Sequence, residues 1–172
     1  MGDAMATTAT VPPFLGARDL FESARAASVD AERIRRQLDA MAERAEGLGG
    51  GGFEPRVRST GEPDRMGARV AAMVDQEANL RRRAESDYAT IELACAVLYG
   101  TDSDAGLSVL VPSWWCDVLW WRYLGCETWE RVGAAVGYSP HRCWEVAQTA
   151  LDVADGWGLV SVMRGRGRAE GA

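Results

Sequence analysis

The chain has 172 residues, of which 47% are hydrophobic, and its 25 acidic residues outnumber its 19 basic ones for a net charge of -6. This length suits one compact domain or a small domain with an extended appendage, with a modest hydrophobic core. The chain shows neither an apolar run as long as a membrane span nor a basic segment before a hydrophobic stretch, so we expect a cytoplasmic protein with no membrane partner.

The first 16 residues mix small polar residues with Pro12 and Pro13 and show no helical period, so we expect residues 1–16 to be disordered. From Leu20 to Leu48, apolar residues recur every four or three positions. This spacing is typical of a long helix that presents one stripe to a partner helix.

A glycine-rich segment at 47–63 predicts a flexible linker after the first helix. Asp64 can cap a second long helix, in which heptad spacing continues from Met66 to Leu98 and predicts an end near Tyr99. Neither apolar stripe can stay exposed. The two helices of residues 17–99 therefore pair antiparallel within one chain, or pair between chains in a dimer.

Residues 100–112 are rich in Gly, Asp and Ser and predict a loop, after which Ser113 can cap a helix over 114–124. That helix carries two tryptophan pairs, 114–115 and 120–121. Successive helical residues point about 100° apart, so the four rings cannot all enter one small core. Packing against the long helices or a second subunit is the favoured explanation, and stacking on nucleic-acid bases is the alternative.

Four cysteines lie far apart with no CxxC pair, and His141 is the only histidine. This favours buried, reduced thiols over a metal site, and we expect no cofactor. The sequence also shows no glycine-rich phosphate loop after a strand and no nucleophile motif, so we do not expect an enzyme. The cysteines are Cys95, Cys116, Cys126 and Cys143.

Residues 119–151 predict a helix-turn-helix, in which apolar residues from Trp129 to Leu151 share one small core if the chain reverses at Gly137. Gly137 can take the left-handed conformation that ends the first helix. Ser139 can cap the second helix, and Pro140 suits its first turn. Small side chains at 133 and 134 allow the two helices to approach closely.

This stretch resembles the helix-turn-helix of sigma factor region 4, and more closely the small phage-encoded regulators of the ArpU and RinA late-transcription type. The resemblance covers about the last third of the chain. Two residues depart from the family pattern: Cys143 replaces a branched aliphatic residue, and Gly133 replaces an alanine. The matching residues are Leu119, Arg122, Tyr123, Gly125, Trp129, Val132, Gly137, Ser139, Ala150 and Leu151.

On the second helix of this unit, Cys143 and Val146 turn inward and the remaining positions face outward. Arg142 can pair with guanine or phosphate, Gln148 with adenine, and Glu145 with the cytosine amino group. An ordinary solvated face is the alternative, and Trp144 suits either a groove contact or a hydrophobic interface. The candidate DNA-binding residues on this helix are Ser139, His141, Arg142, Glu145, Gln148 and Thr149.

The net charge of the C-terminal region predicts weak non-specific DNA affinity, because residues 111–172 hold seven acidic residues and six arginines. Three arginines alternate with glycines in the tail at 163–172, where an arm could reach phosphates or the minor groove. A plain solvated terminus is the alternative. These arginines are Arg164, Arg166 and Arg168.

We therefore expect an all-α protein, with a long antiparallel, coiled-coil-like helical hairpin followed by a small helix-turn-helix domain at 113–162. The predicted function is that of a phage or prophage transcription regulator in the cytoplasm of a bacterial host. It would bind double-stranded DNA as a homodimer or with contact to RNA polymerase, as the resemblance implies. The alternatives are a DNA-packaging component of the terminase small subunit kind and a helical adaptor without DNA affinity.

Overall fold

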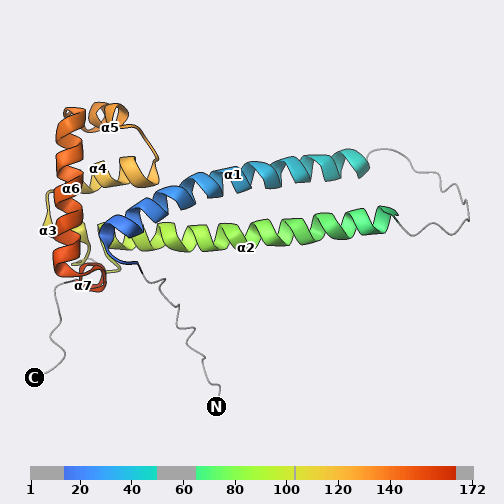
Figure 1. Cartoon of the computed structure of the whole chain (residues 1–172), viewed down its shortest axis with the longest axis horizontal. Coiled ribbons are helices and arrows are strands. Elements are labelled where there is room, and N and C mark those ends of the chain that lie inside the picture. The colour runs from blue at the N-terminus through green and yellow to red at the C-terminus, as the bar shows by residue number, and fades with distance from the viewer. Residues whose placement is uncertain (1–13, 50–64, 103, 166–172) are drawn as a thin grey trace, which may run out of the picture.

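The computed structural model describes residues 14–49, 65–102 and 104–165. This part of the chain is helical and contains no strand, which confirms the all-α prediction. Two long helices extend to one side of a cluster of shorter ones (Figure 1). The elements are α1 (Ala17–Gly49), α2 (Arg65–Tyr99), α3 (Leu107–Leu110), α4 (Ser113–Leu119), η1 (Trp120–Leu124), α5 (Trp129–Val136), α6 (Pro140–Trp157) and α7 (Leu159–Arg164).

The two long helices pack antiparallel within the chain, so the hairpin is intramolecular. The predicted apolar spacing explains the contact, because Ala27, Ala31 and Ile34 on α1 and Leu80 on α2 are buried. Arg83 donates to Asp30 at 2.6 Å and ties the two helices together midway. Asp64, the predicted cap, and residues 50–64 of the linker lie outside the described residues.

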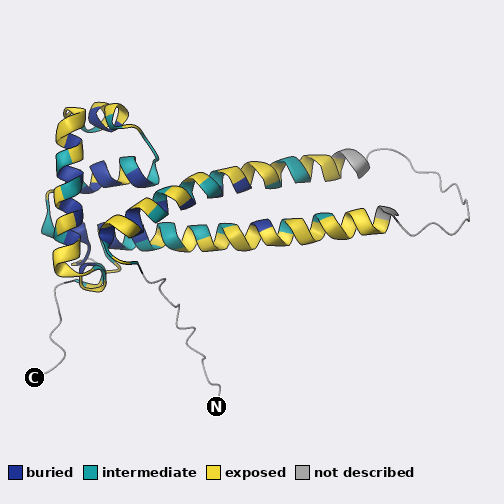
Figure 2. Ribbon diagram, in the orientation of Figure 1, coloured by how far each residue is buried: buried dark blue, intermediate teal, exposed yellow. Residues whose placement is uncertain are grey.

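Burial decreases along the hairpin from its base to its tip (Figure 2). Near the base Ala24 and Leu98 are fully buried, whereas near the tip Val70 and Val74 are 57% and 58% exposed. The tip therefore leaves apolar surface on α2 that the described residues do not cover.

The base of the hairpin belongs to the same core as the shorter helices. Phe21 of α1 contacts Tyr123 of η1 with ring centroids 5.6 Å apart, and both side chains lie in one buried cluster with Leu98 and Leu151. The backbone NH groups of Thr101 and Gly106 donate to α7, which closes the end of the cluster. The helices after residue 106 thus share one core with the base of the hairpin.

Several boundaries differ from the sequence prediction. The expected loop at 100–112 contains the single helical turn α3, because Leu107 is fully buried. Ser113 begins α4 but does not cap it, since Pro112 occupies the cap position. The helix expected to run to residue 124 changes to a wider π turn, in which the Gly125 NH donates to the Trp120 carbonyl.

Both ends of the described chain are more ordered than predicted. Phe14 packs against the core, and the Ala17 NH donates to Asp155 of α6 at 2.5 Å. Arg164, the first arginine of the expected tail, lies in the last turn of α7. The predictions for residues 1–13 and for Arg166 and Arg168 concern residues outside the described part of the chain.

Candidate nucleic-acid interface

The turn between α5 and α6 has the geometry predicted for a helix-turn-helix. Gly137 lies in the left-handed region at φ 80° and ψ 26°, which a side chain would disfavour. The NH groups of Gly137 and Tyr138 both donate to the carbonyl of Gly133, at 2.9 and 3.1 Å. These bonds end α5 and reverse the chain within three residues.

Gly133 allows α5 to approach the turn closely. A Cβ at this position would lie 2.6 Å from the backbone oxygen of Tyr138 and 3.3 Å from the nitrogen of Pro140. An alanine at this position would therefore require the turn backbone to shift. Ala134 is exposed, so the prediction that it also serves close packing was wrong.

Both helices of the unit begin with a side-chain cap. Ser139 accepts a hydrogen bond from the Arg142 NH at 3.2 Å, and Pro140 occupies the first turn of α6, as predicted. Thr128 caps α5 by accepting from the Arg131 NH at 3.4 Å. This second cap was not predicted, although a threonine directly before an apolar-periodic helix is a recognisable start signal.

The structure turns most candidate residues of α6 toward solvent. The inner face is buried against α4 and α5 through Cys143, Val146, Ala147, Ala150 and Leu151. The predicted site residues of α6 therefore share the opposite face. Among them, Ser139, His141, Arg142 and Thr149 are exposed, whereas Glu145 and Gln148 are half-buried.

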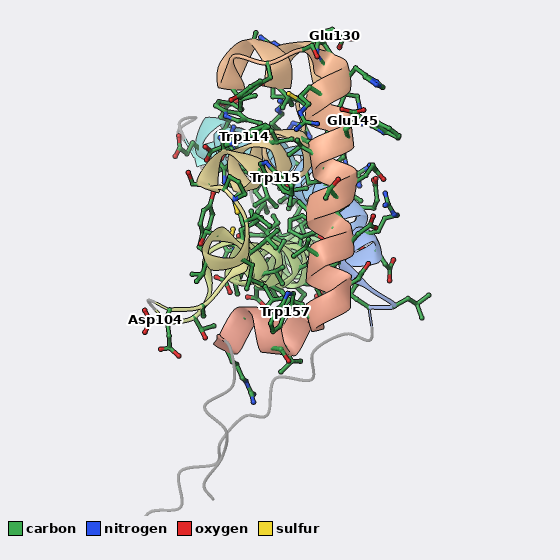
Figure 3. The ribbon with its side chains drawn as sticks, turned by 90° about the vertical axis from the view of Figure 1, so that its left-hand side faces the viewer. Asp104, Trp114, Trp115, Glu130, Glu145 and Trp157 are labelled. Carbon is green, nitrogen blue, oxygen red and sulfur yellow. The ribbon has the colours of Figure 1, made fainter. Side chains whose placement is uncertain are left out.

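Glu145 lies at the centre of this exposed face and contacts two of the other candidates. Arg142 donates to its carboxylate at 3.3 Å, and the His141 ring lies 3.4 Å from it. Figure 3 shows Glu145 on α6, on the side away from Trp114 and Trp115. The acidic side chain thus partly neutralises Arg142, a positive group expected to meet DNA.

Aromatic side chains flank the candidate face. The Tyr138 ring stacks on Trp114 with centroids 4.4 Å apart, and the His141 ring stacks on Trp144 at 6.1 Å. Trp144 is 46% exposed, so its surface remains open to a groove or to a protein partner.

The four tryptophans at 114, 115, 120 and 121 divide into two groups. Trp114 and Trp115 are half-buried and pack against the core, so the four rings do not all share one environment, as expected. Trp120 and Trp121 contact each other edge to face at 5.1 Å and are each 37% exposed. They lie in the π turn η1.

All four cysteines are free thiols, and Cys95 and Cys126 are only half-buried, unlike the buried thiols predicted. Cys116 and Cys143 are buried, and burial raises the pKa of the Cys116 thiol to about 12. Within residues 14–49, 65–102 and 104–165, no group of three or more His, Cys, Asp or Glu side chains could hold a metal ion. Arg164 is exposed at the end of α7, and it is the one predicted tail arginine that the structure describes.

Comparison of the chain with family models, with curated proteins and with solved structures finds no match. Among the residues that the structure describes, no helix combines the length and the apolarity needed to cross a membrane.

Proposed function

We propose that the chain binds double-stranded DNA through the exposed face of α6 and acts as a phage-type transcription regulator. The observation that carries this proposal is the position of α6 at the surface: a three-residue turn presents it, and its first turn is capped and open to solvent. A helix in this setting can enter the major groove, which is about 12 Å wide. The resemblance to sigma factor region 4 supports the same function.

Each candidate side chain has a role that its chemistry suits. Arg142 pairs with guanine or holds a phosphate, Gln148 pairs with adenine, and Glu145 accepts from the cytosine amino group. Ser139, His141 and Thr149 lie where a phosphate or a base edge would be reached. Arg164, with Arg166 and Arg168, supplies contacts to phosphates.

The net charge of -6 implies that one such unit binds DNA weakly. We propose that the long helices compensate, either by forming a homodimer that carries two DNA-binding units or by contacting RNA polymerase. Two weak sites on one particle reach a much higher combined affinity, because the second binding event becomes intramolecular. No catalytic step belongs to this function.

The test is fluorescence anisotropy on duplexes selected from a random library by the full chain. Replacing Arg142 and Gln148 together by alanine should remove most of the preference for selected over random duplexes, while helicity by circular dichroism stays unchanged. Arg82→Ala on the hairpin is the matched control and should bind as the unmodified chain does. Equal discrimination by all three proteins would exclude α6 as the reading element.

The rival functions predict other outcomes of the same experiment. A helical adaptor would show no DNA affinity even at low salt, where phosphate contacts are strongest. A packaging component would form a ring-shaped oligomer, which light scattering detects.

A further inference from the structure

A second stripe, with apolar residues at both ends and one acid and one base in its middle, runs along α2 beside the stripe that contacts α1. Its members follow a spacing of four, three, four, three and four residues, which keeps them within an arc of about 80° on a helix. Val70, Val74 and Tyr88 are 57%, 58% and 50% exposed. We call this set the outer stripe of α2; it consists of Val70, Val74, Glu77, Arg81, Ala84 and Tyr88.

The outer stripe borders a groove between the two long helices near the tip of the hairpin. Leu38, Asp39 and Ala42 line the groove from α1, and Val70, Val74, Glu77 and Arg81 line it from α2. An open groove between two helices accepts the side chains of a further helix, as in a four-helix bundle.

The outer stripe can pair with a second copy of itself that runs in the opposite direction. Around position 79, Glu77 mirrors Arg81, Val74 mirrors Ala84, and Val70 mirrors Tyr88. When two such stripes meet antiparallel across a two-fold axis at this position, each acid faces a base and each apolar residue faces another. Isologous dimers require this self-complementarity.

Charge selects the antiparallel orientation over the parallel one. Asp39 and Glu77 line the same groove, and Arg35 and Arg81 each lie one turn nearer the hairpin base. A parallel pair would place four acids at one level and four arginines at the next. An antiparallel pair alternates them and extends the existing pairs, which are Arg81 with Glu77 at 2.5 Å and Arg35 with Asp39 at 3.3 Å.

We infer that a second copy of this chain packs on the outer stripe of α2, antiparallel and two-fold symmetric about position 79. Tyr99, at the base of the hairpin, is 20 residues from the axis, or about 30 Å along the helix at 1.5 Å per residue. The two hairpin bases are thus about 60 Å apart, and the two helix-turn-helix units lie at opposite ends of the dimer. This pairing specifies the homodimer of the proposed function, and it is measured without DNA so that the two proposals fail separately.

Charge reversal in the full chain tests the pairing by sedimentation velocity. Arg81→Glu or Glu77→Arg alone should weaken dimerisation at least about tenfold, because like charges then face each other across the axis. The double variant E77R/R81E should recover dimerisation, since it restores an acid opposite a base. Arg82→Glu changes the charge equally but lies off the stripe, so it should dimerise as the unmodified chain does.

A monomer at every concentration, a ring, or equal effects of R81E and R82E would overturn the inference. A double variant as weak as the single ones would also overturn it. Circular dichroism of each variant separates lost pairing from lost helix.

Cysteine cross-linking tests the orientation. A mixture of Val70→Cys and Tyr88→Cys chains should form the mixed disulfide, whereas neither variant alone should cross-link through its new cysteine. Disulfides between two Val70→Cys chains would instead demonstrate parallel packing. The unmodified chain, with its four native cysteines, supplies the background.

Discussion

The Cα atom of Gly133 faces the backbone oxygen of Tyr138 so closely that a methyl group there would lie 2.6 Å from that oxygen. The partner atom belongs to the turn backbone, which the Gly133 carbonyl also holds through two hydrogen bonds. The contact between α5 and the turn thus depends on the absence of one side-chain carbon.

Gly133→Ala should therefore destabilise the protein even though alanine favours helix. The steric overlap costs roughly 1–3 kcal/mol and the gain in helix propensity is about 1 kcal/mol, so the net loss is up to about 2 kcal/mol. Urea denaturation measures it. Gly156→Ala is the control, because a Cβ at Gly156 would meet nothing within 4 Å and that variant should gain stability. A Gly133→Ala protein more stable than the parent would contradict the geometry.

Ser139 caps α6 and Ser113 does not cap α4, so the two serines should respond differently to the same change. Ser139→Ala should lose about 1 kcal/mol of stability, because the Arg142 NH loses its acceptor. Ser113→Ala should stay within about 0.5 kcal/mol of the parent. Thermal unfolding of both variants measures the difference. Equal losses would mean that the Ser139 cap does not stabilise α6.

The elements that the sequence predicts well depend on local signals. Heptad spacing predicts the hairpin because each apolar stripe repeats along a single helix. The turn at Gly137 is predicted because the glycine, the capping serine and the proline follow one another within four residues. The elements missed depend on contacts between distant residues. Leu107 lies in a helical turn that buries its side chain in the core. Gly133 is required because the backbone oxygen of Tyr138, five residues later, lies against it once the chain reverses.

The candidate site shows the same division. The outward direction of the α6 residues follows from helical period, and Glu145 meets His141 and Arg142 because it lies four and three residues after them on one helix. The shared core of Phe21 and Tyr123 is instead a long-range contact, since more than 100 residues separate them along the chain.

Glu145→Gln should raise the affinity of the chain for random duplex DNA. The change releases Arg142 and His141 from a carboxylate and removes one negative charge from the proposed contact face. Anisotropy titrations at two salt concentrations measure this, and the salt dependence should become steeper. Glu92→Gln, an exposed position on α2, changes the charge equally and should leave the affinity nearly unaltered. The same increase in both variants would indicate a general charge effect.

Stability should fall at alkaline pH through the buried thiol of Cys116. Burial raises the pKa of this thiol from an ordinary 9.0 to about 12, so the unfolded chain releases its proton at lower pH than the folded one. The contribution of this thiol to the free energy of unfolding is complete below pH 9. It decreases between pH 9 and 12, by on the order of a few kcal/mol. Burial raises the pKa of Cys143 and Tyr123 in the same direction.

Urea denaturation at pH 8, 9 and 10 tests this slope. Cys116→Ala should flatten the pH dependence whatever its effect on stability at pH 8, because the titrating group is gone. An unchanged slope in that variant would assign the alkaline loss to the other buried groups.

The antiparallel dimer limits the DNA that it can occupy. Its two hairpin bases lie about 60 Å apart, whereas half-sites one helical turn apart are separated by about 34 Å. Both units therefore cannot occupy adjacent half-sites of that spacing, and the dimer should hold two duplexes, or two distant segments of one.

Donor-labelled and acceptor-labelled duplexes that carry the selected site should show energy transfer when the unmodified chain is added. Arg81→Glu should abolish the transfer while each chain still binds one duplex, and the double variant E77R/R81E should restore it. Tight, cooperative binding to two half-sites one turn apart would instead require both units on the same side of the particle, which the arrangement about position 79 does not allow.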